Sequence, residues 1–135
     1  MLSIQRVAAI SGFVFVLVSV LGFFTMGMGG MQMGGSSVML LGFFPVNALH
    51  NLVHGLFGVW GLVAARSAKA SLVYTLGSGA VYLLLGILGL FTDSLLGMVP
   101  IGGYDVVLHL VLAIALAGCG FWSMWFVPQR RPVSA

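Results

Sequence analysis

Three histidines carry most of the chemistry that this sequence could perform. His50 and His54 stand four residues apart, and His109 follows Asp105 at the same spacing. Side chains at this spacing share one face of a helix, where imidazoles can bind a metal ion or exchange protons. Together with nearby amides and one phenol they form a predicted polar cluster. Its members are Asn47, His50, Asn51, His54, Tyr82, Asp105 and His109.

The segments that must position this cluster are apolar enough for a lipid bilayer. The chain has 135 residues, is 61% hydrophobic and only 5% charged, and its mean hydropathy is +1.19. Four windows approach the length of about 20 residues that spans a bilayer: 7–24, 46–65, 70–91 and 104–127. The sequence predicts one all-α membrane domain over 1–135, a four-transmembrane-helix bundle with a Gly- and Met-rich outer loop at 25–45.

The basic residues predict the orientation of this bundle. Arg6 precedes the first window, Arg66 and Lys69 separate the second and third, and Arg130 and Arg131 follow the fourth. All five lie on one side if four helices alternate, and positive charge favours the cytoplasmic side. We therefore expect a multi-pass protein of the bacterial inner membrane with cytoplasmic N and C termini and a retained first helix. No basic residue is left over for nucleic acid.

The sequence also resembles itself. "PVNALHNLVH" aligns with "PIGGYDVVLH" at an offset of 55 residues, which pairs His50 with Asp105 and His54 with His109. "SGFVFVLVSVLGFF" aligns with "SGAVYLLLGILGLF" at an offset of 67. These alignments predict two tandem helical hairpins, related by a pseudo-twofold axis along the membrane normal.

The polar residues of the second window share one helix face with glycines. On a helical projection, Asn47, His50, Asn51 and His54 fall within a sector of roughly 100° that also holds Gly58 and Gly61. Unpaired polar groups are costly in lipid, and small residues let helices approach closely, so this face should point inward. The glycines predicted to pack helices are Gly55, Gly58, Gly61, Gly86 and Gly89.

The segments "ALHNLVHGLFGVWGL", "YLLLGILGL" and "DVVLHLVLA" resemble a bacterial family of small four-helix membrane proteins, domain of unknown function 4383. The resemblance covers nearly the whole chain and is most specific at residues 50–55. It implies that the family's characteristic positions are His50, Asn51, His54, Gly55, Asp105 and His109. The chain departs from the family in its short Gly- and Met-rich loop and in Val106, where Asn is frequent. The resemblance implies no particular chemistry.

Metal binding is one hypothesis for the cluster. His50, His54, Asp105 and His109 could supply four ligands for zinc or copper. Met26, Met28, Met31 and Met33 add thioethers at the predicted periplasmic face, and thioethers favour Cu(I). A Met loop that feeds a His site would indicate copper acquisition or transfer. The competing interpretation of the loop is an adaptable contact with the lipid interface.

Two other hypotheses concern haem and catalysis. His54 and His109 could supply two axial haem ligands, although other polar residues crowd the same layer. Residues 50–54 resemble the H-E-x-x-H motif of metalloproteases, but Asn51 replaces the Glu that acts as general base. With two acidic residues in the chain and no catalytic constellation, we expect no enzyme activity.

The remaining interpretation is structural. A hydrogen-bonded polar network would fix how the helices pack, and the protein would serve as a scaffold or accessory subunit of a membrane complex, binding other membrane proteins or itself without a cofactor. This is the leading functional prediction, and metal binding is the alternative. Residues 36–44 are expected to form a short helix or re-entrant turn at the outer interface, or a plain connection.

Overall fold

The computed structural model describes residues 3–27 and 37–126. It is mostly helical, with α1 at Ile4–Met26, α2 at Ala48–Ala64, α3 at Ala68–Gly89 and α4 at Tyr104–Phe126. The helices α1, α3 and α4 are long and apolar enough to cross a membrane. The fourth, α2, is apolar but has only 17 residues. Each helix lies within a few residues of a predicted window.

Side-chain caps explain where three of the helices begin. The Ser3 side chain accepts a hydrogen bond from the Arg6 N–H, Asn47 accepts one from His50, and Ser67 accepts one from Ala70. Each cap satisfies a backbone donor that has no partner within the helix. Asn47 therefore sets the first turn of α2 and, with it, the position of His50.

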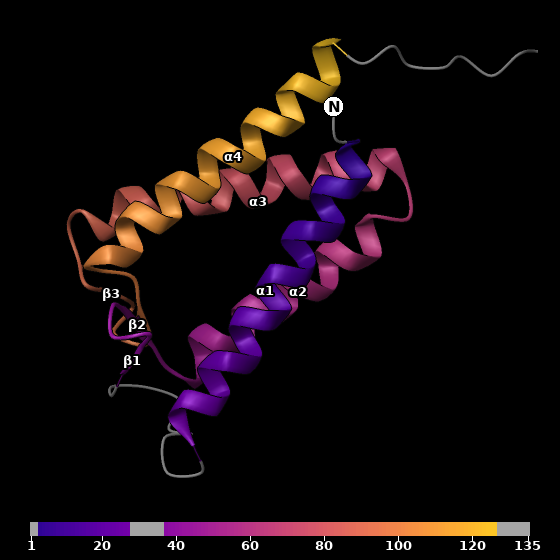
Figure 1. Ribbon diagram of the computed structural model, residues 1–135. Coiled ribbons are helices and arrows are strands. Elements are labelled where there is room, and N and C mark those ends of the chain that lie inside the picture. Colours follow the sequence, from indigo (N-terminus) through magenta and orange to yellow (C-terminus); the bar gives the residue numbers. More distant parts are fainter. Residues whose placement is uncertain (1–2, 28–36, 127–135) are drawn as a thin grey trace, which may run out of the picture.

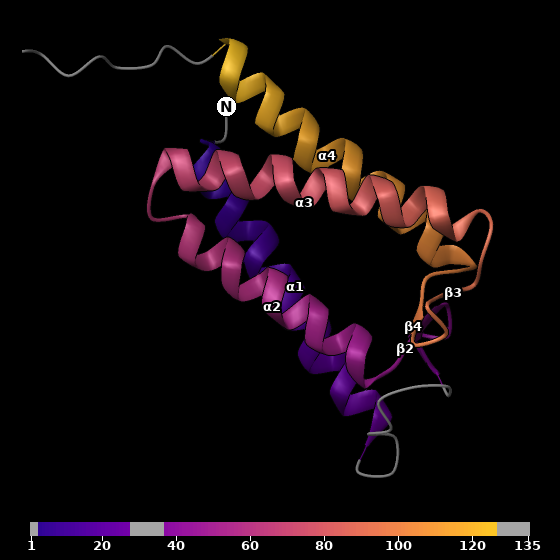
Figure 2. The ribbon, with the colours of Figure 1, turned by 180° about the vertical axis from the view of Figure 1, so that it is seen from behind.

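The helices form two antiparallel pairs, α1 with α2 and α3 with α4 (Figure 1). Figure 2 shows from behind that the pairs approach each other near the N-terminus and diverge toward the strands. Glycines bring the paired backbones together. A Cβ atom on Gly12 would lie 2.7 Å from the backbone nitrogen of Leu62, and one on Gly79 would lie 2.8 Å from that of Ala117.

Two short β-hairpins lie between the diverging ends of the pairs. In the first, β1 (Val38–Leu40) pairs with β2 (Phe44–Val46). In the second, β3 (Ser94–Leu95) pairs with β4 (Val99–Pro100). The turns Leu41-Gly42 and Leu96-Gly97 have positive φ at both central residues, as in a type I′ turn.

The expectation of a short helix at residues 36–44 is wrong for the described part, 37–44, which lies in the first β-hairpin. The backbone turns at Leu41-Gly42 instead, and the Phe43 N–H donates to the Leu40 carbonyl to close the hairpin. The first hairpin places Pro45 opposite Met39, and the second places Pro100 opposite Ser94. Pro45 and Pro100 are 55 residues apart in the sequence, and so are Met39 and Ser94.

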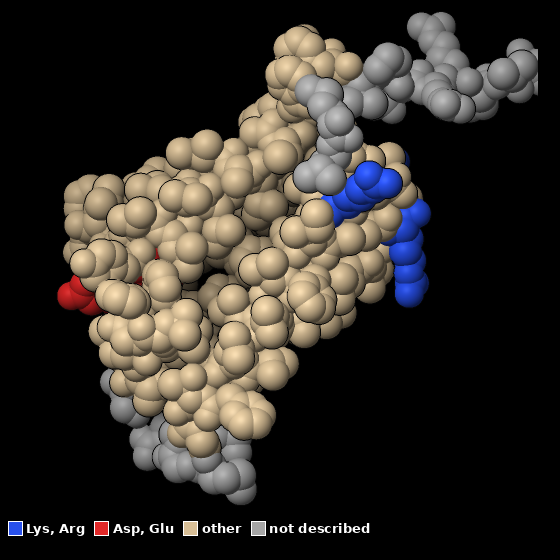
Figure 3. All heavy atoms as spheres, viewed as in Figure 1, with Lys and Arg blue, Asp and Glu red and all other residues tan. Residues whose placement is uncertain are grey.

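Charged side chains lie at opposite ends of the molecule. The Lys and Arg side chains of the described residues gather at the end where α1 begins and where α2 connects to α3, whereas acidic atoms appear at the hairpin end (Figure 3). Between these ends the exposed surface is dominated by large apolar side chains. This division suits a protein that places an apolar belt in lipid.

Candidate functional site

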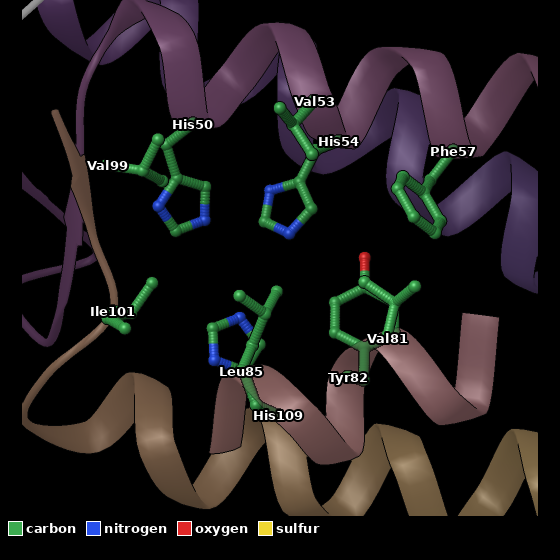
Figure 4. Close-up of a pocket in the computed structure, with 10 residues that line it drawn as sticks. All are labelled: His50, Val53, His54, Phe57, Val81, Tyr82, Leu85, Val99, Ile101 and His109. Carbon is green, nitrogen blue, oxygen red and sulfur yellow. The ribbon is translucent and has the colours of Figure 1, made fainter. Parts of the chain in front are cut away.

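The polar cluster lies between the two helix pairs, close to the β-hairpins. Figure 4 shows His50 and His54 projecting from α2 toward Tyr82 of α3 and His109 of α4. These four side chains and Asp105 are all at least 95% buried. The fold thus brings together five of the seven residues of the predicted cluster.

Asp105 lies between two imidazoles. Its Oδ2 is 3.9 Å from Nε2 of His50 and 3.7 Å from Nε2 of His109. Nδ1 of His50 lies 3.1 Å from the carbonyl oxygen of Pro100. A carbonyl only accepts, so Nδ1 carries the hydrogen of that bond and Nε2 is the nitrogen that faces the carboxyl group. Both distances to Oδ2 exceed a direct hydrogen bond.

Four stacked rings connect the two helix pairs. His54 stacks on Phe15 with 5.7 Å between ring centroids, Phe15 stacks on Tyr82 at 5.4 Å, and Tyr82 stacks on His109 at 5.5 Å. We call these four residues the ring ladder. Such contacts stabilise by about 0.5–1.5 kcal/mol each beyond area burial. The ladder holds the two imidazoles at either end of a rigid aromatic stack.

The two asparagines lie at the edge of the cluster. Asn47 caps α2 and its amide donates to the Met98 carbonyl, so it ties the first helix pair to the second hairpin. Asn51 faces α1, where its amide donates to the sulfur of Met26 at 3.0 Å. The Ser19 hydroxyl donates to the Asn51 carbonyl at 2.7 Å. Both asparagines therefore fix the packing around the imidazoles.

A small cavity lies among the imidazoles and Tyr82. Its volume is about 30 Å³, and Val53, Phe57, Val81, Leu85, Val99 and Ile101 complete its lining. This exceeds the roughly 10–15 Å³ that one water molecule requires. Nδ1 of His54, Nδ1 of His109 and the Tyr82 hydroxyl make no hydrogen bond within the described chain. The cavity lining is almost entirely apolar, and these three polar atoms lie at its edge.

The metal and haem hypotheses gain little from this geometry. Among the described residues, no group of three or more His, Cys, Asp or Glu is placed to hold a metal ion. Met26 is engaged with Asn51, and Met28, Met31 and Met33 lie outside the described residues. A cavity of about 30 Å³ is far too small for a porphyrin between His54 and His109.

The sequence prediction missed several residues of this interior. Phe15 completes the ring ladder, and Gly12 and Gly22 bring α1 against α2. Tyr74 is fully buried on α3. The alignment at an offset of 67 could have identified Phe15, because it pairs Phe15 with Tyr82. Phe15 is otherwise indistinguishable from the lipid-facing phenylalanines around it.

The predicted glycine contacts can be located individually. Gly58 and Gly61 of α2 lie against Gly12 of α1, where an added Cβ would come within 3.0 Å of backbone atoms. A Cβ on Gly55 would lie 3.0 Å from the Ser19 oxygen. On the other pair, Gly86 packs against Leu110. Gly89 packs against Ile101 and Val106 at the start of α4.

The fold and its site define a small helical protein with membrane-length apolar helices and a buried polar cluster. The chain belongs to the family described as "Domain of unknown function (DUF4383)", whose model matches residues 5–122. The resemblance found in the sequence is thereby confirmed. No curated protein and no solved structure matches the chain.

Proposed function

We propose that all four helices cross a bacterial inner membrane with both termini in the cytoplasm. The basic side chains at one end of the described molecule support this orientation, because positive charge is retained on the cytoplasmic side. The 17 residues of α2 rise about 26 Å, slightly less than the hydrocarbon core of about 30 Å. The β-hairpins at the outer end of α2 would cover the remaining thickness of the hydrocarbon core, with their backbone surrounded by protein.

We further propose that the chain is a duplicated hairpin. Contacts between the helices of one pair recur in the other at the offsets found in the sequence. Gly12 meets Leu62 as Gly79 meets Ala117, and Gly22 meets Asn51 as Gly89 meets Val106. In the ring ladder, Phe15 on His54 corresponds to Tyr82 on His109. These matches support an axis that passes between Phe15 and Tyr82.

The function that we propose is that of a non-enzymatic scaffold or accessory subunit of a membrane complex. A groove between α3 and α4 carries this proposal. Its volume is about 430 Å³, and it is lined by Leu76, Gly79, Ala80, Leu83, Ala113, Ile114, Ala117, Gly118 and Phe121. Small residues let another helix approach closely in a membrane, so an apolar transmembrane helix is the partner that fits.

The groove distinguishes the two halves of the proposed duplication. At the positions that correspond to Ala80 and Gly118, the first pair carries the larger Phe13 and Val63. At the positions that correspond to Leu76 and Leu83, the first pair carries the smaller Ala9 and Val16. The two halves therefore differ in the shape of this face and not in the overall size of its residues.

Copurification from native membranes tests this proposal. Ala80 is exposed in the groove, so Ala80→Leu should fill the groove and release a partner or a second copy from the tagged protein. Ala115→Leu is the matched control, since Ala115 is exposed on α4 and is not among the groove residues. A monomer in mild detergent without any stoichiometric partner would contradict the proposal, as would equal copurification with both variants.

Copper or zinc binding is the alternative, favoured by the approach of His50 and His109 to one oxygen of Asp105. It has less support, because the described side chains do not form a ligand set. Elemental analysis separates the two proposals.

A further inference from the structure

One side of α3 is polar and buried along most of its length. Ser71, Tyr74, Ser78 and Tyr82 recur every three or four residues, and none is more than 2% exposed. At 1.5 Å per residue they extend over about 16 Å of the helix. Tyr82 stacks on Phe15 of α1, and the Tyr74 ring lies 5.1 Å from that of Trp60 of α2. This polar side of α3 therefore lies between the two helix pairs.

The polar side of α3 continues into the imidazole cluster. Tyr82 lines the same small cavity as His54 and His109, and the rings of His50 and His54 are 4.5 Å apart. The Pro100 carbonyl accepts the hydrogen bond from His50, and Pro100 also lines a pocket of about 140 Å³ beside the hairpins. Asn47 and Asp93 line the same pocket.

At its other end the polar side of α3 reaches the connection between α2 and α3. The Ser71 hydroxyl donates to the Ala64 carbonyl at 2.9 Å, two residues before Arg66. Buried polar side chains thus recur from the hairpin end to the basic end. We call this line the polar column; its members are His50, Asp105, His109, His54, Tyr82, Ser78, Tyr74 and Ser71.

Half of the members of the polar column lack a hydrogen-bond partner within the described chain. Four buried atoms are in this position: Asp105 Oδ2, His109 Nδ1, His54 Nδ1 and the Tyr82 hydroxyl. The Tyr74 hydroxyl lies next to the hydroxyls of Ser11 and Ser78. Each unpartnered atom costs about 1–3 kcal/mol unless something satisfies it. Water is the small molecule that commonly does so inside proteins. The surface between the two helix pairs is hollowed, as Figure 3 shows.

We propose that the polar column is a hydrated path along which protons cross the membrane. Hydroxyl groups and neutral imidazoles can each accept a hydrogen bond and donate one, which is what a proton relay requires. The cavity of about 30 Å³ has room for water but not for a hydrated metal ion. A proton taken up at one end is matched by one released at the other, so no cofactor is consumed.

The proposal depends on the membrane crossing that we propose above, but not on the groove between α3 and α4. Titratable groups face the column from three helices. His50 and His54 come from α2, and Tyr74 and Tyr82 come from α3. Asp105 and His109 come from α4. From α1 the column is faced by the apolar ring of Phe15 and, near Tyr74, by Ser11.

Proton flux into proteoliposomes tests the inference. The full-length protein is reconstituted with a pH-sensitive dye inside the vesicles, and a potassium gradient with valinomycin drives protons inward. We expect faster acidification than in protein-free vesicles, with loss of this difference in Tyr82→Phe and in Tyr74→Phe. Tyr104→Phe is the matched control, because Tyr104 is 65% exposed and outside the column.

Both test variants keep the buried aromatic ring and remove only its hydroxyl, so they should fold. Gel filtration and thermal unfolding verify this. Wild-type flux equal to that of protein-free vesicles would overturn the proposal, and so would undiminished flux in both variants. Labelling of each end in the same vesicles establishes that the protein crosses the membrane, which separates failure of the relay from failure of the topology.

Discussion

Gly12 shows how single residues bring the helices of one pair together. An added Cβ there would lie 2.7 to 2.9 Å from backbone atoms of α2, and backbone cannot move aside as a flexible side chain can. Close approach of this kind replaces the hydrophobic driving force that is absent between helices in lipid. The contact depends on a missing side chain and not on any attractive group.

We predict that Gly12→Ala destabilises the protein by about 1–3 kcal/mol, the cost of overpacking a filled interior. Thermal unfolding in a mild detergent measures the effect. Gly118→Ala is the matched control, because a Cβ on Gly118 meets nothing within 4 Å and Ala favours a helix. Equal unfolding temperatures for the two variants would contradict the predicted close contact.

Asn47 performs two separate tasks that can be tested at one position. Its side-chain oxygen caps α2, and its amide donates to the Met98 carbonyl of the second hairpin. We expect Asn47→Ala to lose both and to cost at least about 1 kcal/mol, the usual value of a cap. Asn47→Asp should keep the cap but turn a carboxylate oxygen toward the Met98 carbonyl, which repels it, so this variant should also unfold below wild type. Unfolding of Asn47→Ala at the wild-type temperature would contradict both roles.

At the scale of elements, the two hairpins close the diverging ends of the helix pairs. Both turns place a leucine in the left-handed region, with φ of 54° at Leu41 and at Leu96. A left-handed conformation costs an ordinary residue about 1–2 kcal/mol, which the surrounding structure must offset. The hairpin hydrogen bonds and the contacts of Val46 and Ile101, both about 1% exposed, provide that compensation.

We therefore predict that Leu96→Asn raises the unfolding temperature, because Asn tolerates the left-handed region and is favoured in this turn. Gly97→Ala should lower it, since φ is 71° there. Neither substitution removes an interior contact, as Leu96 is 82% exposed and nothing lies within 4 Å of a Cβ on Gly97. Thermal unfolding of both variants tests this prediction, and their unfolding temperatures should shift from wild type in opposite directions.

The helices were more predictable than the connections. Apolar windows of nearly membrane-spanning length carry a strong signal, because length and hydropathy are local properties of the chain. The hairpins were missed because Leu-Gly is not a typical turn dipeptide, and an ordinary residue seldom adopts the left-handed region. Residues 37–44 are also apolar enough to imitate an interfacial helix.

At the scale of the whole molecule, the sequence predicts which residues form the polar cluster but not how their side chains are arranged. Helical spacing and the internal alignment grouped the imidazoles with Asp105. The same reasoning could not tell that Asn51 turns toward Met26, or that Phe15 lies between His54 and Tyr82. Those outcomes depend on how two helix pairs cross, which no local pattern encodes.

The proposed topology yields a labelling prediction for the whole molecule. In a Cys119→Ser background, Asp93→Cys should react with an impermeant maleimide added to intact cells, because Asp93 lies at the proposed periplasmic end. Lys69→Cys should react only after the membrane is permeabilised. The reverse pattern would invert the proposed orientation, and labelling of both in intact cells would contradict the crossing.

On the proposed proton path, the buried imidazoles and Asp105 hold protons and water and not a metal ion. Elemental analysis of the purified, untagged protein after growth with added metals tests this most directly. We predict far less than one copper, zinc or iron per chain, with no change in His54→Ala. Near one equivalent of copper or zinc that is lost in His54→Ala would contradict the account and establish the cluster as a ligand shell.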